Sequence, residues 1–409
     1  MNPHLHGSKQ IKSLAIMVRG FDMAGAVAIS SLHHAEALAG DYEVLILTDT
    51  GPAKTRRLGY NLTVQKLDTF SLHWLRRYSH VPNELLFILC TAIQLLLGLN
   101  SKRFDVVVFH SHPSTALLAP IFRRRLRCKT VMVMHGDIND RPAGTYDPRL
   151  TWWYKITTGR AYRVVDAVIA LSTYMRNFAI AGGAHPEKVF IVPNGVDPAE
   201  IGLSTIDQPN QSTDATAKHS TRILFIGRIE YNKGVDLLVQ AFARLKAHFP
   251  ELSLCCVGGP NPTFMRALRE QIRVLGVEDS LEFIPPVSRS QLGAFYRSAK
   301  LVVVPSRSET QSTVLMESMA ASKPVVASDT GGNTMMVVEN ETGLLFPSGN
   351  ADGLYAALKK LLSDEKQLML MGEAAQRRYN ELYSLEKTAA DLRQAFSEIM
   401  NNGERLNHL

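Results

Sequence analysis

The chain has 409 residues, of which 45% are hydrophobic and 20% charged, and this composition excludes a disordered, collagen-like or coiled-coil protein. Its length predicts two or three domains of roughly 100–200 residues each. The net charge of +7 is unevenly placed, because residues 1–200 carry 23 Lys and Arg against 15 Asp and Glu, whereas residues 201–409 carry 22 against 23. The basic first half predicts an anionic partner, such as a membrane surface, a phosphorylated ligand or nucleic acid, unless the excess charge only forms a solvated face.

The first half alternates strand-like apolar runs with helix-like segments, such as the helical pattern over 28–39. The apolar runs are 13–18, 42–48, 105–109, 130–134 and 167–170. This β-α-β order predicts a parallel sheet covered by helices on both faces. The uncharged stretch Leu85–Asn100 is too short to span a bilayer as a helix. We expect it to be a helix buried against the sheet, with a helix that dips into a membrane interface as the alternative.

Three features of the chain bear on its location. The segment Met1–Lys12 is polar and lacks the apolar core of a signal peptide. The cysteines form no zinc-type C-x-x-C pair, and the adjacent Cys255 and Cys256 would point to opposite faces of a strand, so reduced thiols are expected. The densest basic run is Arg123–Lys129. We therefore expect a cytoplasmic protein, peripheral on an anionic membrane face through its basic N-terminal domain.

The second half begins with a polar stretch, 206–220, which has no apolar period and indicates a linker. The alternation then restarts, with apolar runs at 222–229, 252–257, 281–284, 301–304, 324–328 and 343–346. We predict an α/β protein with two Rossmann-like doubly wound domains facing a cleft, the first over 1–205 and the second over 206–384. In such sheets ligands bind beyond the carboxyl ends of the strands, so motifs that follow strands are the candidate sites.

The segment Gly227–Gly234 directly follows the first strand of the second domain and opens a helix. Its two glycines let the backbone approach a ligand closely, and a helix N-terminus attracts anions. Arg228 offers a planar fork and Lys233 a point charge, a pair suited to a diphosphate. The alternative is that the glycines serve turns and the two cations are exposed.

A second segment, 305–317, follows the strand over 301–304 and contains two carboxylates eight residues apart, Glu309 and Glu317. One precedes a helix and the other lies within it, so they can reach different parts of one ligand. Backbone N–H groups near Gln311, Ser312 and Thr313 would face a phosphate. The alternatives are helix capping for Glu309 and a solvated helix residue for Glu317.

His135 follows the apolar run 130–134 of the first domain, where it can face the cleft. A single histidine at such a place is as readily a structural residue as a functional one.

Together these motifs resemble the retaining glycosyltransferases of family 4, which have the two-domain GT-B fold. The pair Glu309…Glu317 is similar to that family's E-x7-E motif, and Gly227–Gly234 to its G-R-x-x-x-x-K-G segment. Further matching segments are Asp166–Ser172, Val192–Asp197, Thr330–Gly332 and Glu341–Pro347. The resemblance covers almost the whole chain, and the motifs occur in the family's order.

The resemblance implies a role for each of these side chains toward a nucleotide sugar. Arg228 and Lys233 would neutralise the donor diphosphate. Glu309 would hold hydroxyls of the donor sugar, and Glu317 would hold the ribose hydroxyls. The developing charge on the leaving group needs cations or oriented dipoles, and these residues with the helix N-terminus can supply them. Because the chain has no D-x-D motif, we expect no metal or other cofactor.

Two candidate residues lie in the first domain. The resemblance places His135 beside the sugar and the acceptor, and Gly25, in the loop after the first strand, near the phosphates or the acceptor. It also implies that the C-terminal segment 385–409 packs back onto the first domain.

The chain departs from the family at several places. Thr310, Gln311 and Ser312 stand where the family has Gly and Phe residues after the first Glu, Met335 stands in place of a Glu, and Pro285 in place of a Gly. These changes predict an unusual pocket for the donor sugar and base.

We interpret the chain as a retaining, hexosyltransferase-type enzyme that moves a sugar from a nucleotide-diphosphate sugar to an acceptor hydroxyl, in cell-surface polysaccharide or glycolipid synthesis. The alternatives are a catalytically silent nucleotide-sugar-binding protein and a sugar-nucleotide epimerase on the same fold. Nucleic-acid binding is disfavoured, because the basic run 123–129 contains no aromatic residue. The expected partners are a nucleotide sugar and a glycan or lipid-linked acceptor.

Overall fold

The computed structural model describes residues 12–18, 26–48, 56–66, 104–110, 113–136, 148–203 and 221–405. The predicted site residue Gly25, the apolar stretch 85–100 and the polar stretch 206–220 lie outside these ranges. The chain divides into two compact units. Unit 1 holds the described residues up to Val192 and those from Ala389 onward, and unit 2 holds Pro193–Thr388.

Unit 1 is built on one sheet with the strand order β3-β4-β2-β1-β5-β6-β7-β8. Its strands are β1 (Lys12–Val18), β2 (Tyr42–Thr48), β3 (Arg56–Arg57), β4 (Leu62–Lys66), β5 (Val106–His110), β6 (Lys129–Met134), β7 (Ala167–Ala170) and β8 (Val189–Ile191). Its helices are α1 (Ala26–Leu38), α3 (Pro113–Ala116), α4 (Ala119–Leu126), α5 (Pro148–Val164) and α6 (Thr173–Ala181). The pairs are parallel except β3 with β4, which are antiparallel.

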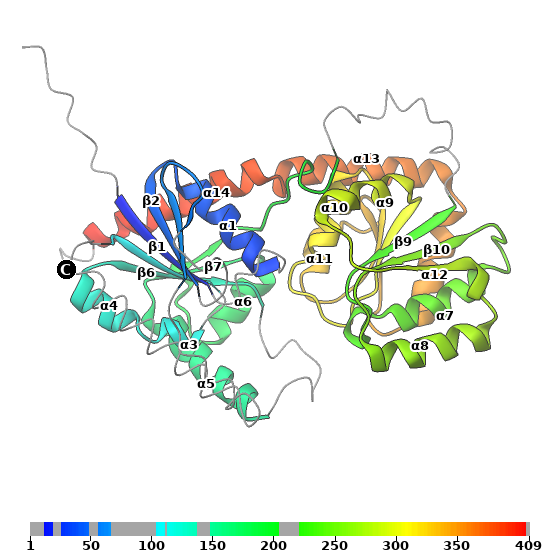
Figure 1. Cartoon of the computed structure of the whole chain (residues 1–409), viewed down its shortest axis with the longest axis horizontal. Coiled ribbons are helices and arrows are strands. Elements are labelled where there is room, and N and C mark those ends of the chain that lie inside the picture. The colour runs from blue at the N-terminus through cyan, green and yellow to red at the C-terminus, as the bar shows by residue number, and fades with distance from the viewer. Residues whose placement is uncertain are drawn as a thin grey trace, which may run out of the picture. The chain divides into compact units, whose positions relative to one another are not determined.

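The sheet of unit 1 is buried on both faces, as the continuous apolar runs predicted. Leu14 and Ile16 of β1 belong to one hydrophobic cluster, together with α1 and the C-terminal helix, and Met17 belongs to another, together with α4, α5 and α6. Figure 1 shows these two groups of helices on opposite sides of the sheet. Alternate residues of one strand therefore anchor the two layers of helices.

The C-terminal helix α14 (Leu385–Arg405) begins in unit 2 and packs along unit 1. Leu392 and Phe396 lie in the hydrophobic cluster that contains the β1 side chains, and Arg393 Nε donates to the carbonyl of Ala37 at 2.9 Å. Burial of a side chain such as Phe396 contributes about 1.5–3 kcal/mol, so this helix is part of the core of unit 1.

Unit 2 is built on a wholly parallel sheet with the order β11-β10-β9-β12-β13-β14. Its strands are β9 (Arg222–Ile226), β10 (Ser253–Val257), β11 (Leu281–Ile284), β12 (Leu301–Val304), β13 (Val325–Ser328) and β14 (Gly343–Phe346). Its helices are α7 (Val235–Leu245), α8 (Pro262–Leu275), α9 (Leu292–Ser298), α10 (Thr313–Ala320), α11 (Asn333–Met336), α12 (Ala351–Leu362) and α13 (Glu365–Leu382). The predicted α/β class, with two doubly wound parallel sheets, is confirmed.

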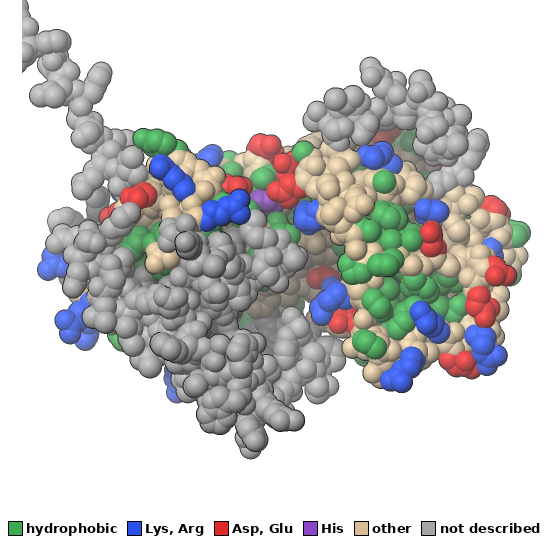
Figure 2. All heavy atoms as spheres, viewed as in Figure 1, with side chains coloured by type: hydrophobic (Ala, Val, Ile, Leu, Met, Phe, Trp, Pro, Cys, Tyr) green, Lys and Arg blue, Asp and Glu red, His purple; other side chains and the backbone are tan. Residues whose placement is uncertain are grey.

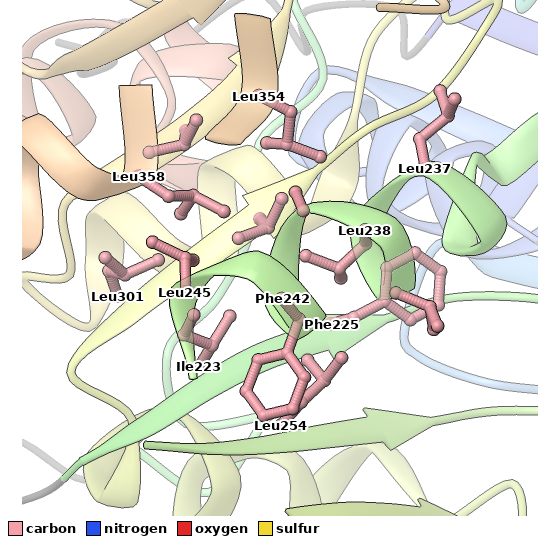
Figure 3. Close-up of a cluster of buried hydrophobic side chains, with 14 of the residues drawn as sticks. Ile223, Phe225, Leu237, Leu238, Phe242, Leu245, Leu254, Leu301, Leu354 and Leu358 are labelled. Atoms are coloured by element: carbon pink, nitrogen blue, oxygen red, sulfur yellow. The ribbon is translucent and has the colours of Figure 1, made fainter. Parts of the chain in front are cut away.

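The core of unit 2 forms a rigid base for the loops at the carboxyl ends of its strands. Figure 3 shows α7 laid on the sheet, with Leu238, Phe242 and Leu245 packed among Phe225 of β9 and Leu358 of α12. These side chains recur every three or four residues along α7, which is why that helix buries one face. On the face of unit 2 that Figure 2 shows, basic and acidic side chains are interspersed, in keeping with the near-neutral charge of the second half.

The division between the units falls at Val192 and Pro193, and not at 205/206 as the polar composition suggested. The reason lies in hydrogen bonds that composition does not reveal. The N–H of Val196 donates to the carbonyl of Tyr383 at 3.1 Å, and the hydroxyl of Tyr379 donates to the carbonyl of Val196 at 2.8 Å. The segment before the predicted linker is therefore anchored to α13 and belongs to unit 2.

Candidate functional site

The loop after β9 lies against the loop after β12, its neighbour in the sheet. Gly234 has a φ of +68°, and a Cβ at this position would lie 1.9 Å from the carbonyl oxygen of Pro305. Gly227 has a φ of +149°, and its carbonyl oxygen would lie 2.0 Å from a Cβ on Gly258. The glycines thus allow backbone segments to meet that any side chain would keep apart.

Two predicted site residues from these loops contact each other directly. Lys233 precedes α7 and Glu309 precedes α10, and the Nζ of Lys233 lies 2.6 Å from Oε2 of Glu309. The hydroxyl of Ser306 also donates to this carboxylate oxygen, at 3.3 Å. Only 22% of the Lys233 side chain and 13% of the Glu309 side chain are exposed. The cation predicted for the diphosphate and the carboxylate predicted for the sugar therefore form one partly buried ion pair.

Arg228, the second predicted phosphate-binding cation, is arranged differently. Its guanidinium makes a two-pronged contact with Glu230, with Nη1 and Nη2 at 3.0 and 2.9 Å from the two carboxylate oxygens. The Arg228 side chain is 61% exposed. Glu230 thus orients a guanidinium that still faces solvent, a role that the sequence alone did not indicate.

A third cation, Arg307, was not predicted from the sequence, and it links the two loops. Arg307 donates to both carboxylate oxygens of Asp236, at 2.9 and 2.7 Å, and its guanidinium carbon lies 3.8 Å above the ring of Tyr231. The N–H of Arg307 donates to the carbonyl of Asn232 at 2.8 Å. The sequence indicated this pair only weakly, through an arginine shortly after β12 and an acidic residue, Asp236, in the first turn of α7.

Glu317 is buried within unit 2, so it is not a solvated helix residue. The hydroxyl of Tyr296 donates to its Oε2 at 2.7 Å, and Nη1 of Arg289 lies 3.1 Å from its Oε1. Burial raises the pKa of Glu317 above its ordinary value, while Arg289 and the Tyr296 hydroxyl act in the opposite direction. Arg289 also lies 3.6 Å from Glu200. Sequence reasoning found the carboxylate but neither of its partners.

The residues between the two carboxylates contact the rest of unit 2. Oε1 of Gln311 accepts from the backbone N–H of Asn194 at 3.1 Å. Ser312 is buried and caps α10, its hydroxyl oxygen accepting from the N–H of Leu315 at 3.4 Å, and Thr313 is the first residue of that helix. Gln311 and Ser312, which depart from the family pattern, therefore have structural partners.

The Thr-Gly-Gly segment after β13 covers the backbone of this loop. A Cβ on Gly331 or on Gly332 would lie 1.9 Å from the carbonyl oxygens of Glu309 and Thr310, respectively. The N–H of Gly332 donates to the Glu309 carbonyl at 2.8 Å. Three loops, after β9, β12 and β13, thus converge on Glu309.

His135, the candidate in unit 1, is half-buried and lies beside two buried histidines, His34 and His110. Its Nε2 lies 2.9 Å from Nδ1 of His110, the last residue of β5, and the ring of His34 on α1 packs 6.3 Å from the His135 ring centre. Burial lowers the pKa of His34 to about 3 and that of His135 to about 4, and it lowers that of His110 well below the ordinary value. We call these three residues the histidine cluster. The sequence drew attention only to His135, although His110 also directly follows an apolar run.

Two kinds of feature are absent from the described residues. Within those ranges no three His, Cys, Asp or Glu side chains are grouped so as to hold a metal ion. None of the helices in the described ranges combines the length and apolar character of a transmembrane span.

Family models match the chain in two consecutive regions. Residues 27–200 match Glycosyltransferase Family 4, and residues 208–378 match Glycosyl transferases group 1. Among curated relatives, the D-inositol 3-phosphate glycosyltransferase of Kineococcus radiotolerans is 31% identical over 296 residues, which make up 68% of this chain and 63% of the relative. The corresponding enzyme of Kribbella flavida is 36% identical over 200 residues, 47% of each chain. The chain thus spans from about half to less than two thirds of the length of these relatives.

Solved structures are similar over nearly the whole chain. Sucrose-phosphate synthase from Thermosynechococcus elongatus has a TM-score of 0.79 at 20% identity and covers 96% of this chain and 100% of its own. Anabaena HepE in complex with UDP-glucose has a TM-score of 0.70 at 18% identity, with 94% and 99% covered. At this identity the likeness concerns the fold. The chain therefore combines a region that matches glycosyltransferase family 4 with a region that matches glycosyl transferases group 1, in the two-domain GT-B fold.

Proposed function

We propose that the protein is a retaining hexosyltransferase that moves a sugar from a nucleotide-diphosphate sugar to an acceptor hydroxyl. The observation that carries the proposal is the contact of 2.6 Å between Lys233 and Glu309. It brings a cation and a carboxylate together at the carboxyl end of a doubly wound sheet, where such folds bind nucleotides. The proposal is supported by relatives that are named as glycosyltransferases and by HepE, a structural neighbour solved in complex with UDP-glucose.

Recognition of the diphosphate is assigned to the loop between β9 and α7. Lys233 supplies a point charge, Arg228 an exposed guanidinium, and α7 the positive end of its dipole. When the diphosphate binds Lys233, it competes with Glu309 for that cation. The Glu309 carboxylate then gains capacity to accept hydrogen bonds from hydroxyls of the donor sugar.

The nucleoside is assigned to Glu317. Each oxygen of its carboxylate has one partner, Tyr296 or Arg289, and each retains a second lone pair for a ribose hydroxyl. Because burial already disfavours the charged form, removal of Arg289 should weaken nucleotide binding as well as the local structure.

The reaction is proposed to proceed on one face of the sugar. The bond from the anomeric carbon to the diphosphate oxygen breaks while the acceptor oxygen forms its bond from the same side, and the hydroxyl proton moves to the departing phosphate oxygen. The negative charge that grows on this oxygen is stabilised by Lys233 and Arg228, so the proposal requires no metal.

The acceptor is proposed to be a glycan or lipid-linked molecule of cell-surface polysaccharide or glycolipid synthesis, met at an anionic membrane by unit 1 from the cytoplasmic side. Arg124, Arg125 and Arg127 at the C-terminal end of α4 are exposed, and we call them the basic face. Arg123 does not belong to it, because its Nη2 donates to the carbonyl of Val164 at 2.6 Å and lies 3.0 Å from Oδ1 of Asp166.

The test combines donor binding with turnover. A thermal-shift screen of nucleotide sugars, beginning with UDP-glucose, identifies the donor, since a ligand that binds the folded state raises its melting temperature. With that donor, Glu309→Ala should lower kcat at least roughly 100-fold, the effect of losing one positioned electrostatic group. Arg273→Ala, in an exposed pair on α8, is the matched control and should keep normal turnover.

Three outcomes would contradict the proposal. Near-normal turnover by Glu309→Ala would remove the assigned site. Inversion of the anomeric configuration in the product would exclude the retaining mechanism. Loss of turnover in EDTA, with recovery on adding Mg²⁺, would exclude the metal-independent mechanism.

A further inference from the structure

The histidine cluster contains hydrogen bonds that play no part in the proposed function. His110 Nδ1 lies 2.9 Å from Nε2 of His135 and 3.0 Å from Oγ of Ser31 on α1. The ring of His34 packs 5.2 Å from the His110 ring centre, yet neither of its nitrogens has a hydrogen-bond partner. One atom, Nδ1 of His110, therefore mediates both hydrogen bonds at the centre of the cluster.

The three rings are neutral near pH 7, because burial lowers the pKa of each of them. A neutral imidazole carries one proton, so one ring nitrogen donates and the other accepts. The hydrogen bonds of the neighbouring groups decide which nitrogen carries it.

Ser31 determines the position of the His110 proton. The Ser31 hydroxyl donates its single proton to the carbonyl of Val27 at 2.6 Å, so its oxygen can only accept from His110. The His110 proton is therefore on Nδ1, and it points toward both Ser31 Oγ and His135 Nε2. His110 Nε2 is then a bare acceptor, and it is buried without a partner, a situation proteins tolerate better for acceptors than for N–H groups.

The opposite arrangement leaves one contact unsatisfied. If His135 Nε2 carried a proton and donated to His110, the lone pairs of His110 Nδ1 and Ser31 Oγ would face each other at 3.0 Å. Only the first arrangement satisfies all three short contacts with the protons available.

We infer that His110 and Ser31 are positioning residues that lock His135 in the tautomer with its proton on Nδ1. This inference rests on the proposed function, together with the place beside the sugar and the acceptor that the family resemblance implies for His135. His135 then acts as a neutral N–H donor through Nδ1, to a hydroxyl or to an oxygen that gains negative charge. It does not act as a base through Nε2, because that atom accepts from His110.

The lock is tested by NMR, which needs no substrate. In the full-length protein labelled with ¹⁵N-histidine, two-bond ¹H–¹⁵N correlations distinguish the two neutral tautomers. The wild type should show His135 with its proton on Nδ1. Ser31→Ala removes the group that sets the direction and should give a mixture of tautomers. His34→Leu is the matched control, because it alters the same histidine cluster without removing a hydrogen bond. It should leave the tautomer of His135 unchanged.

Kinetics with the identified donor test the consequence for the reaction. His110→Leu should lower kcat between about 10-fold and 100-fold with KM changed less than about twofold, the scale of losing a partner that orients a reacting group. His110→Asn places an amide N–H near the original Nδ1 and should restore most of kcat. His34→Leu should stay within about twofold of the wild type.

The outcomes separate the inference from the proposed function. A proton on Nε2 of wild-type His135 would overturn the lock, whatever the activity. A mixture of tautomers in Ser31→Ala without any fall in kcat would overturn the positioning role. A locked tautomer in a protein that turns over no nucleotide sugar would overturn the proposed function and leave the lock standing.

Discussion

The histidine cluster makes the stability of unit 1 depend on pH. In the folded state the pKa of His34 is lowered to about 3, and that of His110 lies well below its ordinary value. In the unfolded chain both have a pKa of about 6.5. As the pH falls below about 6.5 the unfolded state binds protons that the folded state does not, so stability is present above that pH and is lost below it.

The magnitude follows from this difference. Between pH 7.5 and pH 5.5 each fully buried histidine removes about 1.4 kcal/mol from the free energy of unfolding. His34 and His110 together remove about 3 kcal/mol by the same reasoning, and His135 adds to it in the same direction because its folded pKa is lowered to about 4. Since a domain is typically stable by about 5–15 kcal/mol, the effect is easily measured.

Tryptophan fluorescence isolates unit 1 in the assay, because all three tryptophans lie before residue 193. Urea unfolding is followed at pH 7.5 and at pH 5.5 for the wild type and for two variants. His34→Gln removes one proton-binding group and should lose about 1.4 kcal/mol less than the wild type between the two pH values. His185→Gln changes a histidine in the same unit whose side chain is 64% exposed, and should lose as much as the wild type.

Equal pH dependence in His34→Gln and the wild type would refute the reasoning. It would mean that His34 takes up a proton in the folded state, and the neutral cluster on which the locked tautomer depends would be lost with it.

Two further predictions concern the other unit and the surface. Gly234→Ala would place a Cβ 1.9 Å from the carbonyl oxygen of Pro305 at a φ of +68°, whereas at Gly276 the φ is similar, +64°, and the Cβ would meet open space. Calorimetry should show that Gly276→Ala lowers the free energy of unfolding by about 1–2 kcal/mol and that Gly234→Ala lowers it by at least about twice as much. Equal losses would contradict the packing at Gly234. Changing all three arginines of the basic face to Gln should weaken binding to anionic vesicles at low salt by about 100-fold, because each arginine near such a surface contributes about 1 kcal/mol. Vesicle sedimentation measures this binding, and unchanged binding would mean that the basic face is only a solvated surface.

The sequence predicted the class of the fold well because buried parallel strands are continuous apolar runs. The strand β12, with four buried aliphatic residues, stands out between polar loops. The apolar runs did not reveal the domain boundary, because Val196 is held to α13 by two hydrogen bonds to residues far along the chain, Tyr379 and Tyr383.

The candidate site shows a similar division. Lys233 and Glu309 were each identified from position and residue type, but their contact depends on β9 lying next to β12 in the sheet. The partners of Glu317 come from α9 and from the 3-10 turn just before it, and helical periodicity does not specify them. The positions of His110 and Ser31 around His135 likewise follow from strand order and from the placement of α1.

The contacts of Arg307 bear on how tightly a donor can bind. An arginine side chain loses about 2 kcal/mol of conformational entropy when it is fixed. Here the ion pair with Asp236 and the stacking on Tyr231 impose that loss during folding. The loops that would receive the diphosphate are therefore preorganised, and more of the interaction energy with a ligand remains as affinity.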